Sequence, residues 1–167
     1  MKTSEAGIDL IKHFEGLHDG DLKKIGLQPK MCPAGIWTVG YGYALVNKNT
    51  GQWLKGEKDF HLIAKQYPDY VNMTEIQAEK LLAWCLTKYE GIVLKKVKAT
   101  ITQNQFDALV SHTFNTGGSD TLFKLVNQGK IKEATEWIRT KYTTGGGKVL
   151  PGLVRRRAAE AVLFSKI

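Results

Sequence analysis

Apolar residues recur with a helical period over residues 5–15. Ser4 precedes this stripe as a candidate N-cap, and Gly16 follows it as a stop signal, so we predict a helix over these residues. Between Gly16 and Gly56 the pattern changes, because glycine and proline separate short runs of strand-forming residues. We expect three small strands there, at residues 36–41, 44–46 and 52–54.

The rest of the chain has the pattern of a helical bundle. Thr74 with Gln77, and Thr102 with Gln105, match the capping-box pattern ahead of apolar runs and predict helices over 74–95 and 102–114. The glycine pair 117–118 ends the second of these. Shorter helices are expected over 120–128 and 131–141, followed by a flexible loop at 143–147 and a final helix over 151–165 that begins at a proline.

A helix, a small β segment and a helical bundle in this order predict an α+β fold. We expect a single domain over residues 1–167, with a β-rich lobe at about 16–56 and a helical lobe made of 1–15 and 57–167. A cleft between two such lobes is the usual place for an active site.

Composition excludes several classes of protein. With 43% hydrophobic and 24% charged residues the chain is globular, and no run approaches the ~18 apolar residues of a membrane span. The charged N-terminus lacks the apolar core of a signal peptide, so we expect a cytoplasmic chain with Cys32 and Cys85 reduced. The four histidines form no metal-binding motif, and we expect neither a metal nor another cofactor.

Basic residues are in excess, and they are unevenly placed. The chain carries a formal charge of +8, and residues 119–167 hold ten basic against four acidic side chains. Such a basic half favours a polyanionic partner, although a charge that only keeps the protein soluble is an equally good interpretation.

Glu15 ends the first predicted helix, directly after Phe14. The negative end of the helix dipole and apolar neighbours both favour the protonated carboxyl. Cleavage of a glycosidic bond needs a carboxylic acid that stays protonated near neutral pH. A single Glu before a Gly is a weak signal, because most such residues are solvated surface groups.

A more specific block follows at residues 32–42, CPAGIWTVGYG, in which a Pro-Ala-Gly turn leads into a strand. Together with Glu15-Gly16, this block resembles the phage-type lysozymes (glycoside hydrolase family 24), the endolysins of T-even and lambdoid phages. Residues 109–117, LVSHTFNTG, resemble the end of a helix in that family, and residues 152–160, GLVRRRAAE, resemble its C-terminal helix. The three blocks occur in the family's order and span most of the chain.

The resemblance implies a lysozyme-like fold and a muramidase that cuts the β-1,4 bond between N-acetylmuramic acid and N-acetylglucosamine. Glu15 would be the general acid, Cys32 would take a position that is Asp or Cys in the family, and Thr38 would help to hold the attacking water. Asn115 matches a position that contacts substrate, although a helix C-cap is an equally good interpretation. A thiol is a poor base at neutral pH, so we assign Cys32 to positioning or assisting.

The chain departs from the family pattern in two places. Sixteen residues separate Glu15 from Cys32, about eight more than usual, and this polar insertion brings Asp19 and Asp21 near Glu15 as alternative second carboxylates. Tyr43 replaces the family's histidine after Gly42, which we expect to alter local packing only.

Three further expectations concern packing. One of three consecutive arginines should pair internally with an acid while another faces the anionic wall polymer. Cys85 should be buried and inert, and three tryptophans should be core residues. The arginines are Arg155, Arg156 and Arg157, and the tryptophans are Trp37, Trp84 and Trp137.

Two other functions remain open from the sequence. A lytic transglycosylase needs only the acid/base Glu and forms an anhydro sugar, and a non-catalytic cell-wall binding protein would use only the basic half. Nucleic-acid binding is disfavoured because the arginine run has no interleaved aromatic residues. We expect bacterial peptidoglycan as the partner of a monomer without a stable membrane anchor. Such an enzyme would wait in the host cytoplasm until a separate holin releases it to the cell wall.

Overall fold

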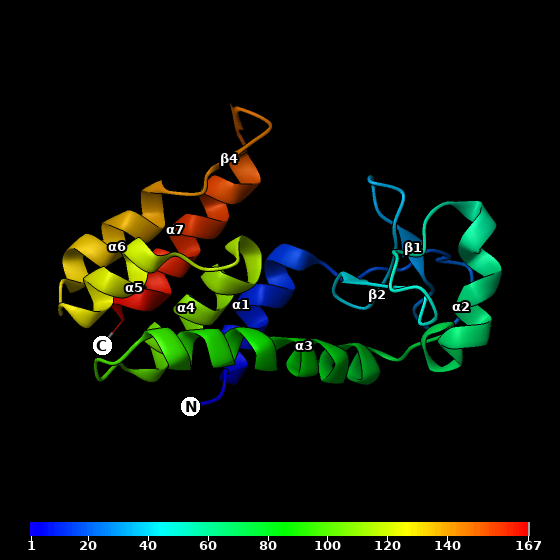
Figure 1. The fold of residues 1–167 in the computed structure, drawn as a ribbon, viewed down its shortest axis with the longest axis horizontal. Helices are drawn as coiled ribbons and strands as arrows, with labels where there is room; N and C mark the ends of the chain where they lie inside the picture. Colours follow the sequence, from blue (N-terminus) through cyan, green and yellow to red (C-terminus); the bar gives the residue numbers. More distant parts are fainter. Residues whose placement is uncertain (167) are drawn as a thin grey trace. The chain divides into compact units, whose positions relative to one another are not determined.

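A computed structural model describes residues 1–166 and divides the chain into two compact units. One unit is formed by Met1–Phe14 and Leu86–Ile167, and the other by Glu15–Cys85. The division falls within the long helix α3 (Glu75–Lys96), which Figure 1 shows as one continuous ribbon. Residues 57–85, which the sequence suggested placing with the helical lobe, are therefore grouped with the strands.

The unit formed by residues 15–85 is built on a three-stranded antiparallel sheet in the order β1-β2-β3. Its strands are short: β1 (Lys30–Met31), β2 (Trp37–Val39) and β3 (Tyr43–Ala44). Thr38 lies opposite Lys30 on one side and Ala44 on the other, whereas Val39 lies opposite Tyr43. Because successive side chains of a strand point to opposite faces, Thr38 and Tyr43 face opposite sides of this sheet.

Short helices complete this unit. They are η1 (Glu57–Asp59), α2 (Phe60–Gln66), η2 (Pro68–Tyr70) and the first half of α3. The core of the unit gathers around Trp37, whose indole nitrogen donates to the Gly56 carbonyl at 2.9 Å and whose ring contacts Phe60. The buried apolar side chains are Trp37, Val39, Tyr41, Leu45, Leu54, Ile63, Tyr67, Met73, Ala78, Leu81 and Leu82.

The other unit is helical. It contains α1 (Glu5–Glu15) up to Phe14, the second half of α3, α4 (Gln103–Thr116), α5 (Asp120–Asn127), α6 (Ile131–Thr140) and α7 (Pro151–Ser165). Helix α7 packs against α4 and α6, and α5 packs against α6. A two-strand hairpin, β4 (Thr144–Gly145) and β5 (Lys148–Val149), precedes α7 where the sequence predicted a flexible loop (Figure 1).

The start of α1 is tied to two other helices of its unit by buried carboxylates. Ser4 donates its backbone N–H and its hydroxyl to Asp107 of α4, and Thr3 donates its N–H and hydroxyl to Glu90 of α3, both at 2.8 Å. Burial alone would raise the pKa of Glu90, but the hydrogen bonds from Thr3 and Lys2 outweigh it and the pKa is lowered. The helix that carries Glu15 is thereby anchored at its other end.

Candidate functional site

Glu15 is the last residue of α1, as predicted, and Gly16 follows it with a φ of 70°. A positive φ favours glycine, which explains why the helix stops there. The Glu15 side chain is half-buried. Its carboxylate oxygen Oε2 lies 3.9 Å from the point where residue 42 would carry a Cβ atom, so a side chain at residue 42 would contact the carboxylate.

Thr38 is buried on β2 and is held by two hydrogen bonds. Its hydroxyl lies 2.8 Å from the carbonyl oxygen of Lys30 and 3.0 Å from Nδ1 of His18. A hydroxyl has one proton and two lone pairs, and the Lys30 carbonyl can only accept. Thr38 therefore gives its proton to Lys30 and accepts from Nδ1–H of His18, which leaves its second lone pair available.

His18 is a site residue that our sequence analysis missed. Burial lowers its pKa, nearby Lys30 lowers it further, and Glu15 acts in the opposite direction with a smaller effect. The neutral imidazole that donates through Nδ1 has an unprotonated Nε2. This atom lies 3.7 Å from the same point beside Gly42 that Glu15 approaches. The Glu15 carboxylate and the His18 imidazole thus both lie within about 4 Å of the same point beside Gly42.

The turn that carries Cys32 connects β1 to β2. The backbone N–H of Cys32 donates to the Ile36 carbonyl, and the N–H of Gly35 donates to the Cys32 carbonyl, both at 2.8 Å. Cys32 is a half-buried free thiol. Cys85 is also free and half-buried, and burial raises the pKa of its thiol to about 11, so it stays protonated at neutral pH.

Asp19 and Asp21, the alternative carboxylates, both hold the inserted loop together. Oδ1 of Asp19 accepts from the N–H groups of Asp21 at 3.1 Å and Gln28 at 3.2 Å. Oδ1 of Asp21 accepts from the N–H of Lys23 at 3.1 Å. Hydrogen bonds of this kind close turns, so the structure gives both carboxylates a role in shaping the loop.

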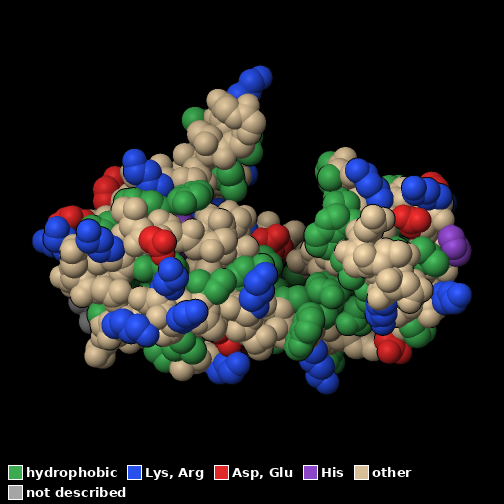
Figure 2. Space-filling view, in the orientation of Figure 1, with side chains coloured by type: hydrophobic (Ala, Val, Ile, Leu, Met, Phe, Trp, Pro, Cys, Tyr) green, Lys and Arg blue, Asp and Glu red, His purple; other side chains and the backbone are tan. Residues whose placement is uncertain are grey.

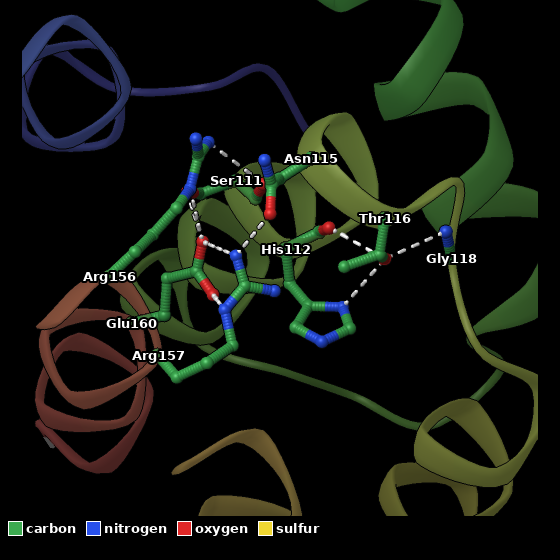
Figure 3. Close-up of polar contacts among 8 residues, drawn as sticks. All are labelled: Ser111, His112, Asn115, Thr116, Gly118, Arg156, Arg157 and Glu160. Carbon is green, nitrogen blue, oxygen red and sulfur yellow. Dashed lines mark hydrogen bonds and ion pairs between the residues drawn. The ribbon is translucent and has the colours of Figure 1, made fainter. Parts of the chain in front are cut away.

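Asn115 belongs to the other unit, at the end of α4. It does not cap the helix, because α4 continues to Thr116 and ends on Gly117, whose φ of 85° is left-handed. Instead its Oδ1 accepts from Nη2 of Arg157 at 2.7 Å, as Figure 3 shows. The C-cap interpretation is therefore wrong, and Asn115 is an exposed amide held in place by a buried arginine.

Behind Asn115 lies a cluster of buried charges. Glu160 of α7 is paired with two arginines of the same helix, Arg156 at 3.1 Å and Arg157 at 3.2 Å, and also accepts from the Ser111 hydroxyl at 2.7 Å (Figure 3). Arg155 is exposed. We expected one of the arginines to pair internally with an acid, and two of them do. Arg156 and Arg157 lie four and three residues before Glu160 on α7, so both side chains reach the face of the helix that carries Glu160.

His112 is fully buried beside this cluster. Its ring contacts Trp137 and Tyr142, and Nδ1 lies 3.3 Å from the Thr116 hydroxyl. Its Nε2 has no hydrogen-bonding partner among residues 1–166. Burial first, and then the Arg157 and Arg156 cations, lower the pKa of His112 to about 3. His112 is therefore neutral in the folded protein at every physiological pH.

Neutral burial of His112 should make the fold sensitive to acid. The unfolded chain takes up a proton near pH 6.5 and the folded chain only near pH 3, so stability is lost as pH falls through this window. We expect a loss of about 2 kcal/mol between pH 7 and pH 5 from this residue alone. The free energy of unfolding, measured by chemical denaturation at pH 7 and pH 5, should differ less between the two pH values for His112→Met than for the wild type. The exposed His13→Asn variant is the matched control, and an unchanged pH difference in His112→Met would refute the expectation.

Two other features of the sequence can be compared with the structure. Trp37 is buried as predicted and Trp137 is half-buried, but the core prediction for Trp84 is wrong, since 62% of its surface is exposed. Within residues 1–166 no three His, Cys, Asp or Glu side chains are grouped to hold a metal ion. No helix in this range has both the length and the apolar character to span a membrane.

Helices in two units, a small antiparallel sheet and a glutamate at the end of the first helix define a protein of the lysozyme class. The family model of phage lysozymes matches residues 12–160. The chain therefore belongs to the phage lysozyme family, and the predicted α+β, lysozyme-like fold is confirmed.

Individual relatives are similar over nearly the whole chain. The endolysin of Acyrthosiphon pisum secondary endosymbiont phage 1 is 33% identical over 98% of each chain. The endolysin of Bacillus phage B103 is 36% identical over 98% of this chain, which spans only 54% of that relative's length. Among solved structures, the muramidase domain of SpmX from Asticaccaulis excentricus is 30% identical, covers 99% of each chain and has a TM-score of 0.71.

Proposed function

We propose that this chain is a peptidoglycan hydrolase of the endolysin type. It would cleave the β-1,4 bond between N-acetylmuramic acid and N-acetylglucosamine and so lyse the bacterial host. The observation that carries this proposal is the arrangement around Gly42, where the Glu15 carboxylate lies within 4 Å of the same point as the imidazole of His18, which is hydrogen-bonded to Thr38. The muramidase and endolysin names of the relatives support the same substrate.

Glu15 acts as the general acid in this proposal. It protonates the glycosidic oxygen as the bond to the sugar breaks, a step that a carboxylic acid supplies in both inverting and retaining glycosidases. Its place at the end of α1, where Gly16 stops the helix, presents the carboxyl beside Gly42 and His18.

Thr38 orients the attacking water. Its proton is used by the Lys30 carbonyl and one lone pair by His18, so its second lone pair can accept a hydrogen from water and turn the water oxygen toward the sugar. We assign Cys32 to assisting this water, since it begins the turn that leads into the strand of Thr38. His18 is then a positioning residue that acts through Thr38.

The second group can be identified with two pairs of variants. We expect Cys32→Asp to retain much of the activity and Cys32→Ala to lose more, because only the former keeps a polar group at the turn. His18→Asn keeps a donor near the place of Nδ1 and should retain more activity than His18→Ala, as rescue of a positioning role requires. Rates on purified peptidoglycan give the readout.

The same variants also separate the alternatives. If His18→Asn and His18→Ala both lower the rate by about 10²- to 10⁴-fold relative to the wild type, then Nε2 of the imidazole is the general base. If Cys32→Ala is fully active, Cys32 has no part in the reaction.

Asn115 is proposed as a substrate contact on the other unit. Its Oδ1 is bound to Arg157, which fixes the amide plane, and the amide nitrogen can donate to a carbonyl of the glycan. We also propose that the protein acts as a monomer and that it waits in the host cytoplasm until a separate holin releases it to the cell wall.

The experiment that tests the function is mass spectrometry of soluble products from purified peptidoglycan. Products that end in reducing N-acetylmuramic acid are expected for a muramidase. Products lighter by one water, with an anhydro end, would instead identify a lytic transglycosylase that depends on Glu15 alone. Binding without products would identify a non-catalytic wall-binding protein.

A further inference from the structure

Two adjoining cavities lie beside β3 and the first half of α3, with volumes of about 390 and 450 Å³. Each is within the range of ligand-binding pockets, about 300–1,000 Å³. They share Tyr43, Asp69 and Tyr70, so they adjoin, and we describe them together. We call the pair the aromatic groove, after the four rings that line it: Tyr43, Tyr67, Tyr70 and Trp84.

The four rings hold one another in place. Tyr67 stacks on Tyr70 with centroids 5.6 Å apart, and Tyr43 meets Tyr70 edge-on at 6.3 Å and Trp84 at 6.0 Å. Aromatic pairs at these distances attract one another, so the rings are positioned before any ligand arrives. Trp84 nevertheless keeps 62% of its surface exposed, and Figure 2 shows hydrophobic side chains gathered over this part of α3.

The aromatic groove is separate from the site at Glu15. Tyr43 lies opposite Val39 in the sheet and so faces the side away from Thr38, whose hydroxyl binds His18. The replacement of the family's histidine by Tyr43 therefore contributes a ring to a surface depression in addition to altering packing. None of the residues assigned to the reaction lines either cavity.

The polar groups of the groove indicate the class of ligand. Asp69, Gln77 and Lys80 line the cavity next to Trp84. Gln66 and Lys48 line the other, but they bond to each other, and Lys48 also lies over the Tyr67 ring. One acid beside two lysines leaves only a small net charge, which is weak for a polyanion, and the polar groups beside Trp84 disfavour a purely apolar helix. Flat rings beside donors and acceptors suit a sugar, which presents an apolar ring face with hydroxyl and amide groups around it.

We propose that the aromatic groove is a second, non-catalytic saccharide site that binds N-acetylated hexosamine units of a glycan strand. This inference rests on the proposed function only for the identity of the sugar. A site on the opposite side of the sheet would hold a neighbouring strand of the cell wall while Glu15 acts on another. The protein would then remain attached to its polymeric substrate between cleavages.

Nuclear magnetic resonance of the Glu15→Gln protein tests the binding directly, with N-acetylchitotetraose as the probe. The indole N–H signal of Trp84 should shift in a saturable way. The signal of Trp53, which is 55% exposed and lines neither cavity, should not. An unmoved Trp84 signal at millimolar probe would overturn the proposal, as would an equal shift with maltotetraose, which lacks the acetamido groups.

Sedimentation with purified sacculi tests the consequence. In the Glu15→Gln background, Trp84→Ala should weaken binding to sacculi about five- to tenfold relative to Trp53→Ala, the matched control. With Glu15 intact, Trp84→Ala should cleave soluble oligosaccharides at the wild-type rate. Equal binding of the two variants would contradict the proposal. A protein that bound the probe through Trp84 but released no products would refute the hydrolase function and leave the groove as a binding site.

Discussion

Replacing Glu15 by Gln should reduce the rate of peptidoglycan cleavage by about 10²- to 10⁴-fold while the protein stays folded. Gln has nearly the shape of Glu but cannot deliver a proton to the leaving oxygen, so the change removes the acid and little else. The side chain lies at the end of α1, half-buried, and the helix is anchored at its other end by Asp107 and Glu90. We therefore expect thermal unfolding to be nearly unchanged.

The matched control is Glu5→Gln, at the first turn of the same helix, where the side chain is exposed. It should leave the rate unchanged. Release of soluble muropeptides from sacculi, measured beside circular dichroism of each variant, gives both readouts. A folded Glu15→Gln protein with wild-type turnover would remove Glu15 from the reaction and with it the proposed mechanism.

The helices could be predicted because their signals are local. Thr74 and Gln77 exchange hydrogen bonds across the first turn of α3, and Thr102 and Gln105 do the same for α4. A capping box lies within four consecutive residues, so the sequence alone shows both partners of its hydrogen bonds. The end of α4 at Gly117 follows in the same way.

The strands were harder to predict because long-range pairing defines them. Lys30 and Met31 become β1 only through pairing with Thr38 and Trp37, and they lie at the end of an insertion that the sequence suggests is a loop. Helix α2 is only seven residues long, without a capping side chain, and was missed as well. The loop at 143–147 closes into a hairpin for the same reason.

The candidate site also combines residues that local motifs mark with residues that only long-range contacts bring together. Glu15, Cys32 and Thr38 come from motifs, but His18 comes from contact between residues twenty positions apart, and no pattern around it marks a partner for Thr38. Trp84 has apolar neighbours along α3, which suggested a core residue. It is exposed because it lies on the side of α3 that lines the aromatic groove.

The second large effect is expected at Glu160, which is fully buried between two arginines. Its side chain is 0% exposed, that of Arg157 is 0% and that of Arg156 is 4%. Removing one partner of a buried ion pair leaves an uncompensated charge in a region that water does not reach. Such changes cost about 3–5 kcal/mol, because the remaining charge keeps its desolvation penalty and loses its attraction.

Glu160→Ala should therefore lower the melting temperature by roughly 10 °C or more, whereas Arg155→Ala, on the exposed side of the same helix, should change stability by no more than about 0.5 kcal/mol. Thermal unfolding gives the melting temperatures, and unfolding in urea gives the free energy of unfolding of each variant. A Glu160→Ala protein destabilised by less than about 1 kcal/mol would show that the arginines find other partners.

The double variant Arg157→Ala with Glu160→Ala tests the cause. If the cost comes from the unpaired cation, the double variant should lose less stability than the sum of the two single variants, since removing Arg157 also removes that cation. Additive losses would instead mean that each side chain stabilises α7 by packing alone.

Because Arg157 also holds Asn115 at 2.7 Å, Arg157→Ala should in addition free the amide that we propose contacts the substrate. Glu160→Ala leaves that hydrogen bond in place, so a fall in activity in folded Arg157→Ala that Glu160→Ala does not share would connect the buried charges to substrate binding.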